Sequence, residues 1–212
     1  MITIVQKEID ITDYPFQLKS FRIAYQNNKI SEKEFRKILL TKNNIHRLQS
    51  IIARNMLVYY FDKKGLFNYM LSSSKNNVPM ILGVKSRYFI SISHSNKLIT
   101  VAISDHRIGI DTEYTQRKFP STLRTKWGYL QYIHPYRTWT AIESYLKYKG
   151  IGLASGFSNI NILFSSPNQN TIIDQANRRV YYSITLKKNS YLITMTQKKK
   201  ISIEQITLVN LS

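Results

Sequence analysis

Hydrophobic and polar residues follow two different spacings along this chain. A spacing of three to four predicts an amphipathic helix, and strict alternation predicts a strand with one buried face. Helices are predicted over residues 31–41, which open with the capping-box pattern Ser-x-x-Glu, and over 139–149, which Gly150 should end. The clearest helical stretch is 44–61, whose apolar positions are Ile45, Leu48, Ile52, Met56, Tyr59 and Tyr60.

Alternating stretches of apolar and polar residues predict strands before and after the predicted helix 139–149. Three of them are separated by short polar turns and are typical of an antiparallel meander. The run Lys198-Lys199-Lys200 is interpreted as a solvated turn between strands. The predicted strands are residues 1–6, then the meander 88–93, 98–104 and 108–113, and then 160–164, 179–186, 191–196 and 201–209.

One short pattern occurs twice. The segments Ser91-Ile92-Ser93 and Leu98-Ile99-Thr100 recur as Ser183-Ile184-Thr185 and Leu192-Ile193-Thr194, each pair being a strand, a polar turn and a strand. Two such hairpins can also arise by chance, because Ser, Thr and Ile are common strand residues. The order of elements predicts an α+β protein of two similar halves, 1–107 and 108–212, each a small antiparallel sheet packed with a long helix. The active site should lie at the seam between them.

Acidic side chains are scarce in most of the chain. From Lys63 to the C-terminus there are six, and three of them are Asp111, Glu113 and Glu143. On an extended segment, Asp111 and Glu113 project from the same face. On the predicted helix, Glu143 and Lys147 are one turn apart and share a face. If the strand end meets the helix, three carboxylates converge.

Such a cluster in a basic protein suits a hard divalent cation. Magnesium takes one or two carboxylates together with substrate phosphates, and Lys147 would steady phosphate oxygens beside it. Each motif alone has a plainer interpretation, because Asp-x-Glu is common at solvated strand ends and Glu-x-x-x-Lys is a common surface ion pair. Their occurrence together favours chemistry.

Four motifs occur in a specific order: Ser91-Ile92-Ser93-His94-Ser95, Ile108-Gly109-Ile110-Asp111-Thr112-Glu113, Trp139-x-x-x-Glu143-Ser144-x-x-Lys147 and Lys149-Gly150-Ile151-Gly152-Leu153. This order resembles the 4′-phosphopantetheinyl transferase family, and within it the surfactin-synthetase-activating type, which is one chain of two similar halves. The resemblance runs from about residue 42 to residue 153.

The resemblance implies a magnesium-dependent transferase that moves the phosphopantetheine arm of coenzyme A to a serine of an acyl or peptidyl carrier protein. It releases adenosine 3′,5′-bisphosphate. By position, Asp111, Glu113 and Glu143 resemble the metal ligands. Glu143 also resembles the base for the carrier serine, and Lys147 resembles the lysine that stabilises the pyrophosphate and the leaving group.

The resemblance also implies that five further residues contact coenzyme A. Ser93 and His94 would contact its phosphates, Lys42 and Arg47 its 3′-phosphate, and Pro79 its adenine. Plainer interpretations stay open for some of them. A histidine in a tight turn, here Ser93-His94-Ser95-Asn96, is commonly a turn residue satisfied by its own backbone, and Lys and Arg on helices are usually solvated.

The chain also departs from the family pattern. Ile142 and Val78 stand where a lysine usually precedes the glutamate and the proline, so two positive groups are missing. The segment 114–138 is shorter than usual for this type and contains no acidic residue, which puts part of the carrier-docking surface in doubt. Trp139, which follows this segment, is interpreted as a core residue.

Composition limits the compartment. At 212 residues the chain is long enough for one large domain or two smaller ones. Cysteine is absent, which excludes disulfides and thiolate metal sites and fits a reducing cytoplasm. No apolar run approaches the roughly 20 residues that span a bilayer. The charged residues Lys7, Glu8, Asp10 and Asp13 argue against a signal peptide. We therefore expect a cytoplasmic monomer without a membrane partner.

The net charge of +19 raises the question of an anionic partner. Nucleic acid is the default for so basic a chain. The cations are spread through the sequence, however, and no zinc-finger spacing, basic zipper or RNA-binding aromatic motif accompanies them. A diffuse basic field equally suits an acidic carrier protein, which the resemblance implies. Two alternatives stay open: a nucleic-acid-binding protein, and a family member that binds coenzyme A or carrier without transfer.

Overall fold

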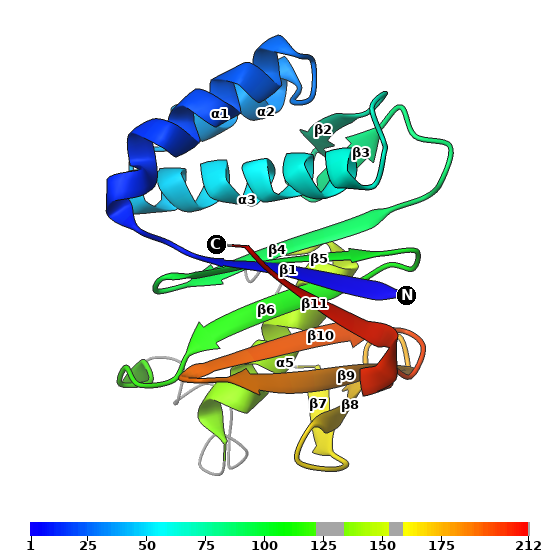
Figure 1. Ribbon diagram of the computed structural model, residues 1–212. Coiled ribbons are helices and arrows are strands. Elements are labelled where there is room, and N and C mark those ends of the chain that lie inside the picture. The colour runs from blue at the N-terminus through cyan, green and yellow to red at the C-terminus, as the bar shows by residue number, and fades with distance from the viewer. Residues whose placement is uncertain (122–133, 153–158, 212) are drawn as a thin grey trace.

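Two facing sheets with helices on both outer sides form this α+β protein (Figure 1). The computed structural model describes residues 1–121, 134–152 and 159–211. Of the α-helices in these residues, three lie on one side and one lies on the other: α1 (Tyr14–Gln26), α2 (Glu32–Leu39) and α3 (Asn44–Lys63), and then α5 (Pro135–Lys149). Within the described residues, no helix combines the length and the apolar character needed to cross a membrane.

The first sheet lies under α3. Its strand order is β11-β1-β5-β4, with bounds Ile206–Leu211, Ile2–Glu8, Leu98–Ser104 and Phe89–Ser95. β11 is parallel to β1, and the other pairs are antiparallel. The last strand of the chain therefore lies beside the first (Figure 1). A separate hairpin, β2 (Met70–Ser73) and β3 (Pro79–Leu82), connects α3 to β4.

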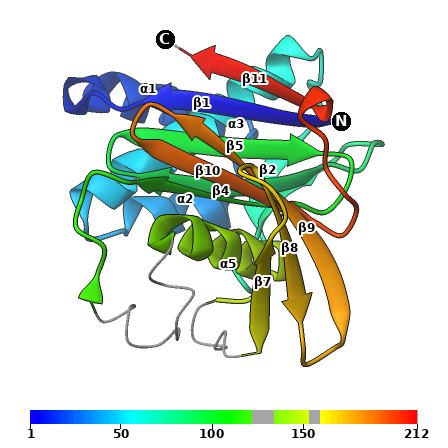
Figure 2. The ribbon, with the colours of Figure 1, turned by 90° about the horizontal axis from the view of Figure 1, so that it is seen from below.

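The second sheet is antiparallel throughout and carries α5 on its outer face (Figure 2). Its order is β6-β10-β9-β8-β7, with bounds Gly109–Tyr114, Tyr191–Gln197, Arg179–Lys188, Gln169–Asp174 and Ile160–Phe164. Two short 3-10 helices complete the described elements, η1 (Ile11–Asp13) and η4 (Ile203–Gln205).

Apolar side chains form three buried clusters between these layers. On β5, Ile99 and Val101 pack toward α3, whereas Leu98 and Ala102 pack toward the second sheet. This alternation explains why β5 is buried along its whole length. The third cluster joins α5 to the outer strands of the second sheet and includes Ile142.

Several predicted elements are confirmed. The helices expected over 44–61 and 139–149 are α3 and α5, although α5 begins earlier, at Pro135. Gly150 ends α5 with a φ of 72°, in the left-handed region that glycine adopts without strain. The Ser31 side chain accepts a hydrogen bond from the backbone N–H of Glu34, as the capping pattern predicted.

The predicted meander is wrong in its third strand. β4 and β5 form the expected hairpin, but β6 pairs with β10, where Asp111 lies opposite Thr194. Alternation shows that a segment is extended, and it carries no information on which distant strand supplies the backbone partner. The segment 201–209 also differs, because η4 precedes β11. The elements α1, β2, β3 and β8 were not predicted from the sequence.

α5 lies against β6 with almost no space at Gly109. A Cβ atom at this position would lie 1.9 Å from the carbonyl oxygen of Ser144 and 2.4 Å from the backbone nitrogen of Tyr148. Both atoms belong to the helix backbone, which cannot move away alone. The missing side chain therefore sets how closely α5 approaches the strand that carries Asp111 and Glu113.

We predict that Gly109→Ala lowers the free energy of unfolding by more than about 2 kcal/mol, because the added methyl group overpacks a backbone contact. Urea unfolding followed by circular dichroism measures this change. Gly152→Ala is the matched control, since its Cβ would meet no atom within 4 Å. Equal stability of the two variants would contradict the close approach.

Candidate functional site

Side chains join the two sheets at the edge where β4 meets β6. Ser91, Ser93 and Ser95 alternate along β4, so their hydroxyls lie on one face. Each hydroxyl oxygen accepts a hydrogen bond from a backbone N–H of β6: Ile110 at 3.0 Å, Thr112 at 3.1 Å and Tyr114 at 3.0 Å. We call this row the serine seam.

The serine seam also holds the two carboxylates of β6. The Ser93 hydroxyl donates to Asp111 Oδ1 at 3.0 Å, and the Ser95 hydroxyl donates to Glu113 Oε2 at 2.8 Å. Since each hydroxyl oxygen also accepts from the backbone of β6, its proton is directed to the carboxylate. The seam therefore fixes both the strand and its acidic side chains.

α5 brings the second motif to the same place. Lys147 Nζ donates to Asp111 Oδ1 and to Ser93 Oγ, both at 2.8 Å. Trp139 Nε1 donates to Glu113 Oε1 at 2.9 Å. Trp139 is buried as expected of a core residue, and its indole N–H also orients a carboxylate, which the sequence did not indicate.

Glu143 lies beside these groups without a hydrogen-bond partner among the described residues. Its pKa is raised to about 7, first by burial and then by the negative charges of Asp111 and Glu113, while the positive charge of Lys147 acts in the opposite direction. Burial and Asp111 also raise the pKa of Glu113. The three carboxylates are therefore close enough to perturb one another, and Glu143 can exchange a proton near neutral pH.

A magnesium ion fits part of this arrangement. Asp111 Oδ2 is buried and accepts no hydrogen bond from any residue that the structure describes. The Glu143 carboxylate is similarly available. Glu113 Oε2, by contrast, already bonds to Arg117. In the parts of the chain described, no three His, Cys, Asp or Glu side chains are arranged as a metal site. Asp111 and Glu143 thus have oxygens available, whereas Glu113 would first have to release Arg117.

A cavity of about 850 Å³ opens on the Glu113 side of the cluster. We call it the α3 cavity, because the first residues of α3 line it together with the β4–β5 turn and Arg117. His46 and His94 both line it and lie next to each other, with ring centroids 5.7 Å apart. His94 lies within β4, opposite Ile99, so the interpretation of His94 as a turn residue is wrong.

A second cavity of about 840 Å³ opens on the Lys147 side. We call it the hairpin cavity, because it is bounded by the β2–β3 hairpin, the start of β4 and the C-terminal end of α5. Pro79 lines it, together with Val78 and Gly150. A smaller cavity of about 260 Å³ adjoins it and also contains Lys147.

The two residues expected at the 3′-phosphate are placed differently. Arg47 lines the α3 cavity and donates a hydrogen bond to Asn44 Oδ1 at 2.6 Å. Lys42 is exposed before α3 and does not line either large cavity. Arg117 and Ser95 contact Glu113 but were not predicted. The alternation of Ser95 with Ser91 and Ser93 was a usable signal.

The departures from the family pattern can be placed only in part. Ile142 is buried in the cluster between α5 and the second sheet, so it packs as a core residue. Residues 122–133, which form most of the shortened segment, lie outside the described residues. Leu153, the end of the last motif, also lies outside them.

We predict that His94 makes the protein less stable in mild acid. Burial first, and then the charges of Lys147 and His46, lower its pKa from 6.5 to about 4. The unfolded chain therefore binds a proton between these values while the folded protein does not, so stability is lost as the pH falls below 6.5. Between pH 7.5 and 5 the wild-type protein should lose about 2 kcal/mol more of its free energy of unfolding than His94→Gln does.

Urea unfolding of both proteins at the two pH values measures this difference. The raised pKa of Glu143 acts in the opposite direction over the same interval, because there the folded state binds the extra proton. Glu143 is present in both proteins, so the comparison isolates His94. Parallel pH profiles would contradict a buried, neutral His94.

No protein-family model matches this chain, and the comparison with curated proteins finds no match. The chemistry of the site is therefore inferred from its residues, their order and their geometry.

Proposed function

We propose that this protein transfers 4′-phosphopantetheine from coenzyme A to a serine of an acyl or peptidyl carrier protein, with magnesium as cofactor. One observation supports this most strongly. Asp111 and Glu113 of β6 lie together with Glu143 and Lys147 of α5, and Lys147 bonds directly to Asp111. Two motifs that are separate in sequence thus supply carboxylates and an ammonium group to one place.

Glu143 is the proposed general base. A base works best when its pKa lies near the operating pH, and in the metal-free protein that of Glu143 is raised to about 7, so that a nearby cation would favour its ionised, proton-accepting form. It would accept the proton of the carrier serine while the serine oxygen bonds to the β-phosphorus of coenzyme A. The bond from that phosphorus to the departing adenosine 3′,5′-bisphosphate then breaks. Lys147 would offset the negative charge on the departing group.

Asp111, Glu113 and Glu143 would hold the magnesium ion, which neutralises and orients a diphosphate when bound. The free Asp111 Oδ2 and the unpartnered Glu143 support this role. Ser93 would act indirectly by directing its hydroxyl proton to Asp111. His94, on the other side of β4, would contact phosphate as a neutral donor, because its pKa is lowered to about 4.

We propose that the fold consists of two similar halves that arose by duplication. In each half a strand is followed by a helix and later by a hairpin whose second strand pairs with the first strand: β1, α3, β4, β5 and then β6, α5, β9, β10. The repeated sequence pattern is in equivalent register, with Ser93 opposite Thr100 and Thr185 opposite Thr194. The boundary near residue 107 falls between β5 and β6, and β11 returns to the first sheet.

We also propose that the protein is a monomer, that it acts in the cytoplasm and that its partner is an acidic carrier protein. The charge of +19 would attract such a carrier and make the encounter sensitive to salt. A non-catalytic relative is less well supported, because Ile142 belongs to the hydrophobic core and the proposed base is unblocked. Nucleic-acid binding is supported by charge alone.

We predict that Glu143→Gln reduces carrier modification to less than a tenth of the wild-type rate, because the amide cannot accept the serine proton. The assay incubates an apo carrier with coenzyme A and magnesium, and mass spectrometry detects the added phosphopantetheine. Folding should be preserved, since the Glu143 carboxylate makes no hydrogen bond with a described residue.

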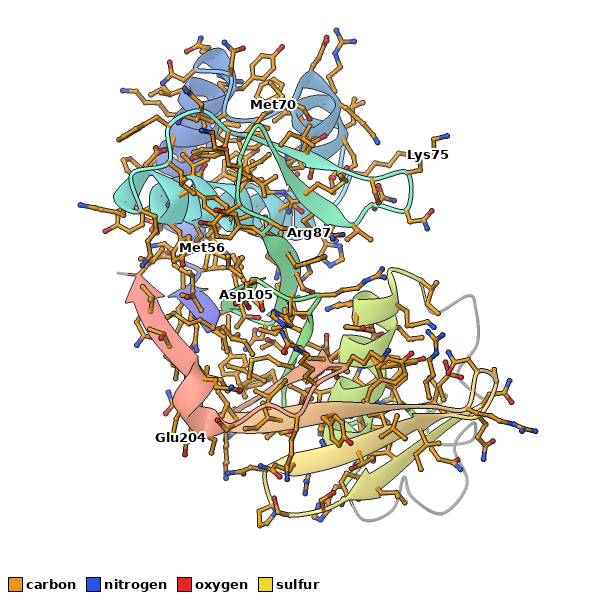
Figure 3. All side chains as sticks on the ribbon, turned by 90° about the vertical axis from the view of Figure 1, so that its right-hand side faces the viewer. Met56, Met70, Lys75, Arg87, Asp105 and Glu204 are labelled. Carbon is orange, nitrogen blue, oxygen red and sulfur yellow. The ribbon has the colours of Figure 1, made fainter. Side chains whose placement is uncertain are left out.

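Glu204→Gln is the matched control, because Glu204 lies in η4, away from α5 (Figure 3). It should transfer at the wild-type rate. More than a tenth of the activity in Glu143→Gln would reject this base. A wild-type protein that modifies no carrier in a panel, and is stabilised by an oligonucleotide but not by coenzyme A with magnesium, would support nucleic-acid binding instead.

A further inference from the structure

The hairpin cavity has an extreme charge balance. Of the described residues that line it, five are cations and none is acidic, the cations being Lys85, Arg87, Arg107, Lys147 and Lys149. Like charges in one cavity repel each other, so an anion bound there gains attraction from several groups at once. The imbalance indicates a ligand that carries more than one negative charge.

The two arginines of this cavity are held in place by neighbouring groups. Arg107 donates from Nη2 to the carbonyl oxygen of Lys149 at 2.9 Å, and its guanidinium lies 5.5 Å from the ring centroid of Tyr148. The Arg87 guanidinium lies 4.8 Å from the ring centroid of Phe89. Arg87 precedes β4 and lies beneath the hairpin in the view of Figure 3. Anchored guanidinium groups lose less freedom when they bind phosphate.

Gly150 brings the Arg107 guanidinium close to the hairpin. A Cβ on Gly150 would lie 3.2 Å from Arg107 Nη2 and 3.1 Å from a methyl carbon of Val78. Arg107 therefore supplies a positive group next to Val78, where the chain has no lysine. Among the described residues, Arg107 Nη1 and Nε make no hydrogen bond and remain available as donors.

The cavity is too large for a single phosphate ion. Its volume of about 840 Å³ is in the range of pockets that bind whole small molecules. Its lining also includes an apolar group from the hairpin, Val78, Pro79, Met80 and Ile81. This combination fits a flat apolar group that carries phosphates. Among the described residues two aromatic side chains line the cavity, Tyr88 and Phe89, and the Phe89 ring already lies against the Arg87 guanidinium, which leaves few surfaces for stacking a nucleic-acid strand.

We propose that the hairpin cavity binds a nucleoside with two or more phosphate groups, and that Arg87 and Arg107 bind the phosphates. If the proposed transfer reaction is correct, on which this identification rests, the ligand is the nucleotide end of coenzyme A. Its 3′-phosphate then lies with Arg87 and Arg107 instead of with Lys42 and Arg47.

The α3 cavity is a weaker site for the same phosphates. Arg47, Lys97 and Arg117 line it, but Asp10 and Glu113 line it too and would repel phosphates, so its excess of positive charge among the described residues is smaller than that of the hairpin cavity. The hairpin cavity also includes Lys147, which bonds to Asp111. A diphosphate that extends from the hairpin cavity past Lys147 therefore reaches the carboxylate cluster without crossing an acidic wall.

Calorimetric titration with adenosine 3′,5′-bisphosphate, in EDTA and at fixed salt, tests this site without requiring transfer. Arg87→Gln and Arg107→Gln should each weaken binding about tenfold, the loss expected for one charge-assisted contact. Arg22→Gln is the matched control, because Arg22 is exposed on α1 and its loss changes the net charge equally. It should bind like the wild type.

Arg87→Lys and the Arg47→Gln variant complete the test. Arg87 makes no hydrogen bond with a described residue, so its variants test the site even if Arg107→Gln loosens the end of α5. Partial recovery in Arg87→Lys would support a phosphate contact. A tenfold loss in Arg47→Gln with none in Arg87→Gln would place the phosphates in the α3 cavity and overturn the proposal.

The outcome for this site is separable from that for the enzyme. If Arg87→Gln and Arg107→Gln modify the carrier at the wild-type rate when coenzyme A is limiting, the cavity assignment is overturned and the proposed transferase activity is not. Bisphosphate binding that depends on both arginines, in a protein that modifies no carrier, would support the cavity and reject the transferase. Absence of bisphosphate binding to the wild type would overturn the cavity assignment.

Discussion

The hydrogen bonds of three serine hydroxyls fix the relation between the two sheets. Ser91, Ser93 and Ser95 each accept from the backbone of β6, so a row of small side chains connects an edge of one sheet to an edge of the other. A larger side chain at these positions would push the strands apart. Because two of these hydroxyls also donate to Asp111 and Glu113, the contact that joins the sheets also orients the carboxylates.

α5 is fixed against the same edge by polar contacts as well as by its apolar face. Thr140 accepts from Thr194 at 2.7 Å, and Ser144 and Thr196 lie 2.7 Å apart, all of them buried. Hydrogen bonds of this kind have defined partners, so they resist rotation of the helix more than apolar packing alone does. Together with the close contact at Gly109, they hold Glu143 and Lys147 toward β6.

The electrostatics of the site follow from this packing. In a protein of net charge +19, three acidic groups lie together and are only partly compensated. Lys147 bonds to Asp111, and Arg117 bonds to Glu113. The Glu143 carboxyl group is desolvated by burial, and its pKa is raised. The cationic hairpin cavity and the acidic cluster share Lys147 as their border. A ligand would match that arrangement if it carried one phosphate for the cationic cavity and a diphosphate that binds a metal ion at the acidic cluster.

Local spacing in the sequence determined the features that depend on neighbours in the chain. The helices α3 and α5 and the common face of Asp111 and Glu113 follow from helical or strand periodicity, and the left-handed end at Gly150 follows from the conformational freedom of glycine. The motif order also indicated which acids to bring together. Only the tertiary structure decided that β6 pairs with β10, that Trp139 and Arg117 bind Glu113, and that the pKa of Glu143 is raised. Strand pairing and burial depend on residues far away in the sequence, and periodicity contains no information about them.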